Sequence, residues 1–258
     1  MLVDTHCHLD FDPLNGDLES VLERAEAAGV HRIVVPSFDA ASRREVARLG
    51  RLESVFPAVG LHPWAADEPL DAVDLAREAQ SCRAVAIGEI GLDTKVEQPS
   101  FDAQMRVFSS QLDVASKLDL PVILHCRGAF DELIRIITNQ PHPVRGVVHA
   151  YSRGPELAQR LIDAGLLLGI GGAATRPRAR RLHRTLKRVP LDRIVLETDA
   201  PSIGLDGIRP EQTEPRHVAD IARAVAMLTD TDLATVAQRT TTNAEALFGL
   251  EAGRGCQE

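Results

Sequence analysis

The 258-residue chain has few cysteines, few aromatic residues and no excess of positive charge. Its four cysteines, Cys7, Cys82, Cys126 and Cys256, form no CxxC pair and no regular spacing. We therefore expect reduced thiols rather than a disulfide framework or a cysteine metal site. Aromatic residues make up 3% of the chain, which argues against a broad surface for stacking bases. The net charge of −8 excludes a protein that holds nucleic acid by bulk positive charge.

Long apolar runs are also missing. No segment approaches the roughly 20 consecutive apolar residues that a membrane helix needs. The N-terminus shows no basic region followed by an apolar stretch, so we expect no signal peptide. Together with the cysteine pattern, this predicts a cytoplasmic protein without a membrane partner. The hydrophobic content of 44% is enough for a sizeable core.

Short β-rich runs alternate with helical patterns along the chain. The runs are continuously apolar, as expected for parallel strands buried on both faces, and they cover residues 2–7, 32–37, 55–61, 84–89, 120–125, 145–149, 166–170 and 193–198. Between them, residues 17–28 and 101–118 repeat apolar residues at steps of three and four, which indicates helices. Two further helical stretches follow the last run, near 215–228 and 231–248.

Eight strands alternating with helices, without a linker, predict an α/β fold of the (β/α)₈ barrel type, formed as a single domain by residues 1–258. An open doubly wound sheet is the alternative. Its usual GxGxxG motif does not follow the first strand, and the one similar cluster, Gly169, Gly171 and Gly172, has the wrong spacing. In a barrel, the active site lies at the C-terminal ends of the strands.

Histidines and carboxylates stand at these predicted strand ends. If residues 2–8 form a strand, its two-residue period places His6 and His8 on one face. The other strand-end residues are His62, Glu89, His125, His149 and Asp199. Each residue alone has a structural explanation, such as orienting a loop. Together, so many imidazoles and carboxylates need a cation to offset their desolvation, which predicts a metal site.

These residues also carry a resemblance to a known family. In order, "DTHCHLDF", "GLHP", "AIGEIGLD", "LPVILHCR", "VVHAYS", "LETDAP" and "RPEQTEPRH" match motifs of the TatD family of metal-dependent hydrolases. The chain closely resembles the YjjV-like branch, and the resemblance covers about its whole length. It implies a (β/α)₈ barrel of the amidohydrolase kind with metal-dependent deoxyribonuclease activity.

The resemblance implies two divalent metal ions per subunit. His6 and His8 would bind one ion together with Asp199, His125 and His149 would bind the other, and Glu89 would bridge them. Asp199 would also accept the proton of the attacking water, either as a ligand or instead of ligating, so Asp199 and Glu89 are the predicted catalytic residues. Four histidines favour Zn²⁺ or Mn²⁺, whereas the family is associated with Mg²⁺, so the metal stays open.

Three residues are predicted to contact substrate: His62, Arg127 and Arg153. Arginine forks match phosphate oxygens, although a structural histidine and surface arginines explain the pattern as well. The segment 175–188 holds seven Lys and Arg residues and would follow the seventh strand. Either a nucleic-acid backbone or solvent covers this basic run.

Three function classes follow. The first is a phosphodiesterase that degrades DNA from an end, the second an amidohydrolase or lactonase acting on a small cyclic amide or ester, and the third a non-catalytic protein that binds phosphate or nucleic acid. The intact set of metal ligands argues against the third class, and the arginines favour the first. Departures from the family pattern at Thr94, Lys95 and the loop 213–215 leave substrate choice open. The oligomeric state is not determined, and a monomer is compatible with the sequence.

Overall fold

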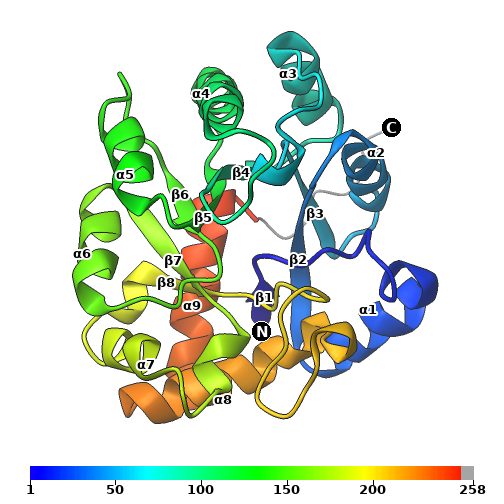
Figure 1. Ribbon diagram of the computed structural model, residues 1–258. Coiled ribbons are helices and arrows are strands. Elements are labelled where there is room, and N and C mark those ends of the chain that lie inside the picture. The colour runs from blue at the N-terminus through cyan, green and yellow to red at the C-terminus, as the bar shows by residue number, and fades with distance from the viewer. Residues whose placement is uncertain (251–258) are drawn as a thin grey trace.

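A computed structural model gives the structure of the chain and describes residues 1–250. Eight parallel strands surround the centre of the molecule and helices lie outside them (Figure 1). The strands pair in chain order, and they are β1 (Leu2–Asp4), β2 (Val30–Pro36), β3 (Val55–Val59), β4 (Ala86–Asp93), β5 (Val122–Arg127), β6 (Gly146–Val148), β7 (Leu166–Ile170) and β8 (Ile194–Leu196). The predicted (β/α)₈ barrel is therefore confirmed, and each strand overlaps a predicted run.

The helices are α1 (Leu18–Ala27), α2 (Ala40–Leu49), α3 (Ala72–Ser81), α4 (Phe101–Leu118), α5 (Phe130–Thr138), α6 (Pro155–Asp163), α7 (Arg180–Leu186), α8 (Val218–Thr229) and α9 (Leu233–Phe248). The predicted helix 101–118 coincides with α4, because Ser100 Oγ accepts the Ala103 N–H at its start and Asp119 adopts the left-handed conformation at its end. No helix within residues 1–250 is long and apolar enough to cross a membrane.

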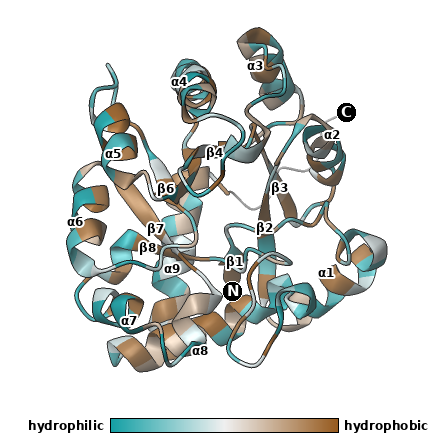
Figure 2. Cartoon of the chain, viewed as in Figure 1, coloured by the Kyte–Doolittle hydropathy of each residue, from teal (hydrophilic) through white to brown (hydrophobic). Residues whose placement is uncertain are grey.

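Apolar side chains fill two layers. One layer lies between the strands and the surrounding helices, and Figure 2 shows strongly apolar stretches along β3 and β7. The other fills the barrel interior and includes Val3, Val34, Ala58, Ile123, Val147 and Val195. Ala244 and Phe248 of α9 pack against this interior layer, and Thr241 Oγ donates to the Met1 carbonyl. Helix α9 thus covers the N-terminal end of the barrel interior.

The barrel closes between the segments that follow β1 and β8. The Thr5 N–H donates to the Leu196 carbonyl at 3.0 Å, and the His8 N–H donates to the Ala200 carbonyl at 2.8 Å. Strand β1 ends at Asp4, so the prediction of a strand over residues 2–7 is wrong after residue 4. The segment after Asp4 stays extended because it pairs across the closing seam, with Cys7 opposite Ala200.

Strand β4 is irregular at Glu89. It was expected to end there, but it continues to Asp93, and its register with β5 shifts between Ile87 and Ile90. The extra residue takes Glu89 out of the regular ladder. Two glycines allow the close approach of β5: a Cβ at Gly88 would lie 2.6 Å from Ile123 Cβ, and one at Gly91 would lie 1.9 Å from the His125 carbonyl oxygen.

The described cysteines form no disulfide: Cys7, Cys82 and Cys126 are free thiols. Cys7 is fully buried, and its Sγ lies 3.6 Å from the Ala200 carbonyl oxygen, within the apolar layer outside the barrel. The fourth cysteine, Cys256, lies outside the described residues.

Candidate metal centre

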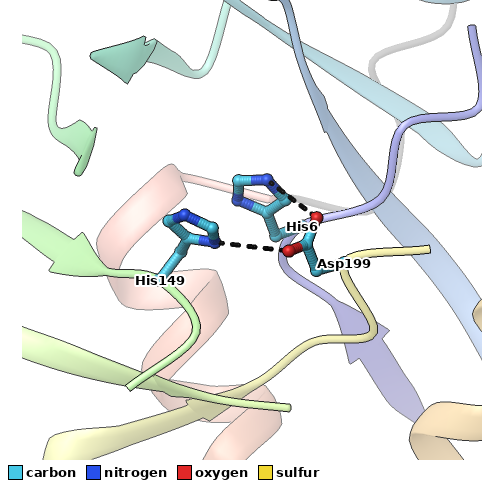
Figure 3. Close-up of side chains that lie close together, drawn as sticks. All are labelled: His6, His149 and Asp199. Atoms are coloured by element: carbon cyan, nitrogen blue, oxygen red, sulfur yellow. Dashed lines mark ion pairs between the residues drawn. The ribbon is translucent and has the colours of Figure 1, made fainter. Parts of the chain in front are cut away.

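Seven side chains meet at the C-terminal end of the barrel: His6, His8, His62, Glu89, His125, His149 and Asp199. They come from six strands or from the segments that follow them. His125 is partly exposed and the other six are buried. Figure 3 shows three of them, His6, His149 and Asp199, converging from separate segments. The structure thus brings together all six predicted metal ligands, with His62 beside them.

The Glu89 carboxylate lies between two pairs of histidines. Its Oε2 is 3.2 Å from His6 Nε2 and 3.7 Å from His8 Nε2. Its Oε1 is 3.0 Å from His125 Nδ1 and 2.8 Å from His149 Nε2. Each carboxylate oxygen therefore faces a different pair, which is the orientation that a bridging ligand requires.

The first donor set consists of His6, His8, Glu89 and Asp199. Four ligand atoms about 2.0–2.2 Å from one ion, at tetrahedral angles, stand about 3.3–3.6 Å apart. The two histidine Nε2 atoms are 3.2 Å apart, and Asp199 Oδ1 lies 3.7 Å from His6 Nε2 and 3.5 Å from His8 Nε2. With the two distances to Glu89 Oε2, these separations fit a divalent cation among the four donors.

The second donor set consists of His125, His149 and Glu89. His125 Nδ1 lies 3.2 Å from His149 Nε2, close to the separation of two ligands of one ion. On the other side of its ring, His125 Nε2 lies 3.2 Å from Asp93 Oδ2. A neutral His125 therefore donates its N–H to Asp93 and presents the lone pair of Nδ1 to Glu89 and His149. Three donors fit a second cation with coordination positions left for water or substrate.

His62 is placed differently from the other histidines. Its Nδ1 accepts the Trp64 N–H at 3.1 Å, so a neutral ring carries its proton on Nε2. That Nε2 lies 3.3 Å from Glu89 Oε1. The distances among His62, Glu89 and His125 also suit a metal, but this tautomer makes His62 a hydrogen-bond donor to Glu89. Its predicted contact with substrate stays a prediction.

Burial and neighbouring charges separate the protonation states of the histidines. Burial, reinforced by the neighbouring charge of His149, lowers the pKa of His6 to about 3, and burial lowers the pKa of His8 to about 4. Both rings are neutral at pH 7 and keep lone pairs for a cation. Burial also acts to lower the pKa of His149, but the charge and hydrogen bond of Glu89, with the charges of Asp199 and Glu197, together outweigh it and raise the pKa to about 10. The ring of His149 therefore holds a proton that a cation must displace.

The two central carboxylates differ in the same way. Burial raises the pKa of Asp199 to about 7, against the opposing charge of His149. Burial also acts to raise the pKa of Glu89, but the surrounding histidines outweigh it, and the pKa falls well below its usual range. Glu89 is thus the permanent negative charge of the cluster at neutral pH.

Two further carboxylates support the site. The Asp4 carboxylate accepts hydrogen bonds from the N–H and the hydroxyl of Thr198. Glu197 was not predicted: it is fully buried, its Oε1 accepts the Ala150 N–H, and it lies 3.9 Å from His149 Nδ1. Gly169 leaves room for it, since a Cβ there would lie 2.2 Å from Glu197 Oε2. The signal in the sequence was a charged residue directly after the apolar residues of β8.

A small aromatic group stands beside the histidines. Phe11 stacks on His8 with ring centroids 4.8 Å apart, and Phe38 stacks on His62 at 4.7 Å. Trp64 packs edge-on against Phe38 and keeps 45% of its surface exposed. The low aromatic content argued against a broad stacking surface and did not predict this narrow one, because its members come from three separate loops. We call Phe11, Phe38 and Trp64 the aromatic rim.

The two predicted substrate arginines are available for binding. Arg127 is exposed at the end of β5, and Arg153 is half-buried in the loop after β6, with its guanidinium 5.8 Å from the Phe130 ring centroid. Within residues 1–250, neither side chain forms an ion pair or a hydrogen bond. In the loop after β8, by contrast, Glu214 is held by Arg24 of α1 at 2.8 Å, so its side chain fastens the loop to the barrel.

Comparisons with known proteins agree with this geometry. Residues 3–249 match the family model of TatD related DNases. The chain is 36% identical over 253 residues to the uncharacterized metal-dependent hydrolase YjjV of Escherichia coli K12, covering 96% of this chain and 98% of that protein. It is 32% identical over 247 residues to the 3'-5' ssDNA/RNA exonuclease TatD of Erwinia amylovora, covering 91% and 94%. The crystal structure of Escherichia coli YjjV superposes with a TM-score of 0.91 at 35% identity, covering 96% and 98%.

Proposed function

Because the chain belongs to the TatD related DNase family of metal-dependent hydrolases, we propose that it is a deoxyribonuclease that cleaves phosphodiester bonds from the end of a strand. The observation that carries the proposal is the position of Glu89 between two histidine pairs. Such a pair of donor sets suits the two ions of a phosphodiesterase, which act about 3.5–4 Å apart.

Six residues would bind the two metal ions of this reaction. His6, His8 and Asp199 would hold one divalent ion, His125 and His149 the other, and Glu89 both. When bound, such ions lower the pKa of water toward neutrality and offset negative charge on phosphate oxygens.

Asp199 is proposed to accept the proton of the attacking water. Its Oδ1 faces His6 and His8 of the first donor set. Its Oδ2 lies 4.0 Å from Nδ1 of His149, the ring nitrogen other than the one beside Glu89 (Figure 3). His62 would keep Glu89 in place through its Nε2–H. Asp93 would keep the ring of His125 turned toward Glu89.

The surroundings of the site favour a nucleic-acid end over a small cyclic amide or ester. The aromatic rim offers an unpaired base a surface on which to stack. No ion pair or hydrogen bond from the described part of the chain occupies the guanidinium groups of Arg127 and Arg153, which leaves them for phosphate oxygens. The Erwinia amylovora relative is named a 3'-5' exonuclease of single-stranded DNA and RNA, and we extend that direction to this chain as part of the proposal.

The proposal is tested with protein reconstituted in Mg²⁺, Mn²⁺ or Zn²⁺ and a 5'-labelled single-stranded oligonucleotide. We expect a ladder of products shortened from the 3' end, and no ladder with Glu89→Gln. A panel of lactones and cyclic amides is assayed in parallel. Turnover of a panel member, with intact oligonucleotide under all three metals, would instead establish the amidohydrolase or lactonase class.

A further inference from the structure

A second feature at the same end of the barrel is a hollow of about 520 Å³ beside α7. It is lined by Ser152, Arg178, Ala179, Arg180, Arg181 and Arg184. All four arginines are exposed to solvent. We call this feature the arginine hollow.

The four arginines have no counter-charge within residues 1–250. Within residues 1–250, none of their guanidinium groups forms an ion pair or a side-chain hydrogen bond. Four other exposed arginines on helices do, each with an acidic residue three positions earlier: Arg48, Arg77, Arg135 and Arg223. Four like charges gathered without partners repel one another, and an anion in the hollow removes that repulsion.

The hollow lies on the side of the barrel where the metal centre opens. Ser152 follows His149 by three residues, in the loop after β6, and the arginines belong to the segment that follows β7. Thr185 Oγ of α7 donates to the Arg153 carbonyl at 2.8 Å, and Leu182 and Leu186 are buried beneath the helix. Figure 1 shows α6 and α7 side by side on this flank. The arginines are thus carried by a segment fixed to the loop that bears His149.

We propose that the arginine hollow binds the phosphodiester backbone of a nucleic-acid strand whose terminal linkage lies at the metal centre. The inference rests on the proposed nuclease function and adds the path of the strand away from the cleaved end. Guanidinium forks match the paired oxygens of a phosphate and carry no base preference. An acidic protein thereby holds a polyanion through a local contact, because its net charge of −8 cannot attract the strand.

The test is charge reversal at two arginines of the hollow, Arg178→Glu with Arg181→Glu. The matched control reverses two exposed cations on α4, Arg106→Glu with Lys117→Glu. Binding of fluorescein-labelled single strands to metal-free protein is measured by anisotropy from 50 to 300 mM salt. Two lost phosphate contacts should lower the slope of log affinity against log salt by about 1.4, at about 0.7 per contact on a single strand.

We expect the hollow variant to bind a 20-nucleotide strand about tenfold or more weakly at low salt, and the control to bind like wild type. Hydrolysis of bis-p-nitrophenyl phosphate by metal-loaded protein should be unchanged in both variants, because this ester has no second phosphate. Arg178→Ala with Arg181→Ala should lower the slope by the same amount. Thermal melting of each variant confirms folding.

Three outcomes would overturn the inference. The first is an unchanged salt slope of binding in the hollow variant, and the second is an equal loss of its hydrolysis of bis-p-nitrophenyl phosphate. The third is that inorganic phosphate competes as strongly with the binding of a dinucleotide as with the binding of the 20-nucleotide strand. The last result would make the hollow a site for free phosphate. A wild-type protein that cleaves no phosphodiester would refute the proposed function instead, and the binding slopes of metal-free protein would still judge the hollow on its own.

Discussion

The backbone N–H of Asp199 donates a hydrogen bond to the carbonyl oxygen of His6 at 2.8 Å. This bond crosses the seam between the segments after β1 and β8, and it places Asp199 Oδ1 3.7 Å from His6 Nε2. Asp199 adopts φ 51°, a left-handed conformation that aspartate tolerates better than most residues. The same two residues, 193 positions apart in the sequence, therefore close the barrel and supply ligands to the first donor set.

Glu89→Gln should empty both donor sets. The amide keeps the volume of the side chain but removes the charge that both oxygens present to the histidine pairs. We expect less than a tenth of the wild-type metal content by elemental analysis after gel filtration, with hydrolysis below detection. Glu156→Gln, on the exposed face of α6, is the control. Near wild-type activity of Glu89→Gln with metal supplied would refute the shared-carboxylate centre.

Metal uptake should release protons and weaken as the pH falls. The raised pKa of His149, about 10, keeps the ring protonated from pH 6 to 9, and the cation must displace that proton. Affinity for the second ion should therefore fall by about tenfold for each pH unit below the pKa. The pKa of Asp199 is raised to about 7. Below pH 7, protonation of this carboxylate should therefore lower the affinity for the first ion as well.

The measurement is a titration of metal-free protein with Mn²⁺ or Zn²⁺ at pH 6, 7 and 8, with proton release followed by an indicator dye. Near pH 8, binding of the second ion is expected to release about one proton. In His149→Gln that proton should disappear while the first ion still binds. An affinity independent of pH across this range would show that His149 is not displaced by a cation.

Asp93→Ala should loosen the second ion alone. Asp93 accepts hydrogen bonds from His125 Nε2 and from Trp64 Nε1. Together with a third bond from the Lys95 N–H, they outweigh burial and lower the pKa of Asp93 to about 2. Without the carboxylate the ring of His125 turns more freely, and removal of such a partner typically weakens metal binding by about 10–100-fold. The stoichiometry of metal titration separates the two ions, and the first should be unaffected. Equal loss of both ions would point to a general disturbance of the barrel end.

The sequence was sufficient to predict the barrel and the set of residues that meet at its mouth. Continuous apolar runs mark buried parallel strands, and parallel strands necessarily bring their C-terminal ends together. His125 and His149 could be found in this way because each follows or ends such a run. The expected position of Glu89 at a strand end was wrong, since the register shift in β4 depends on how Gly88 and Gly91 meet β5.

Other details depend on contacts between distant segments. The ring nitrogen that His62 offers to Glu89 is set by the Trp64 N–H, and periodicity carries no information about a tautomer. The basic run 175–188 was compatible with solvent or a nucleic-acid backbone. The structure adds that Arg178 and Arg181 have no acidic partner within residues 1–250 and share one hollow, which the order of residues along the chain does not reveal.

Trp64 provides the sharpest test of nucleic-acid binding, because it is the only tryptophan of the chain and is 45% exposed beside the metal centre. If a terminal base stacks on it, single-stranded DNA should quench the fluorescence of metal-free protein. Stacking on an aromatic side chain is worth about 1–3 kcal/mol per base, so Trp64→Ala should raise the KM for an oligonucleotide by about 5- to 150-fold. Trp64→Phe keeps a ring and should raise KM far less, although it loses the hydrogen bond to Asp93.

A substrate with an abasic residue at its 3' end, combined with Trp64→Ala, makes a double-mutant cycle that tests the contact between base and indole. In wild type, removal of the base should raise the KM as much as Trp64→Ala does, since both changes remove the same contact. In Trp64→Ala, removal of the base should raise the KM no further, because the indole that the base stacks on is already absent. Penalties that simply add would show that the base and the indole act independently. The aromatic rim would then be packing for His62 and Asp93, and recognition of the strand would have to come from its phosphates alone.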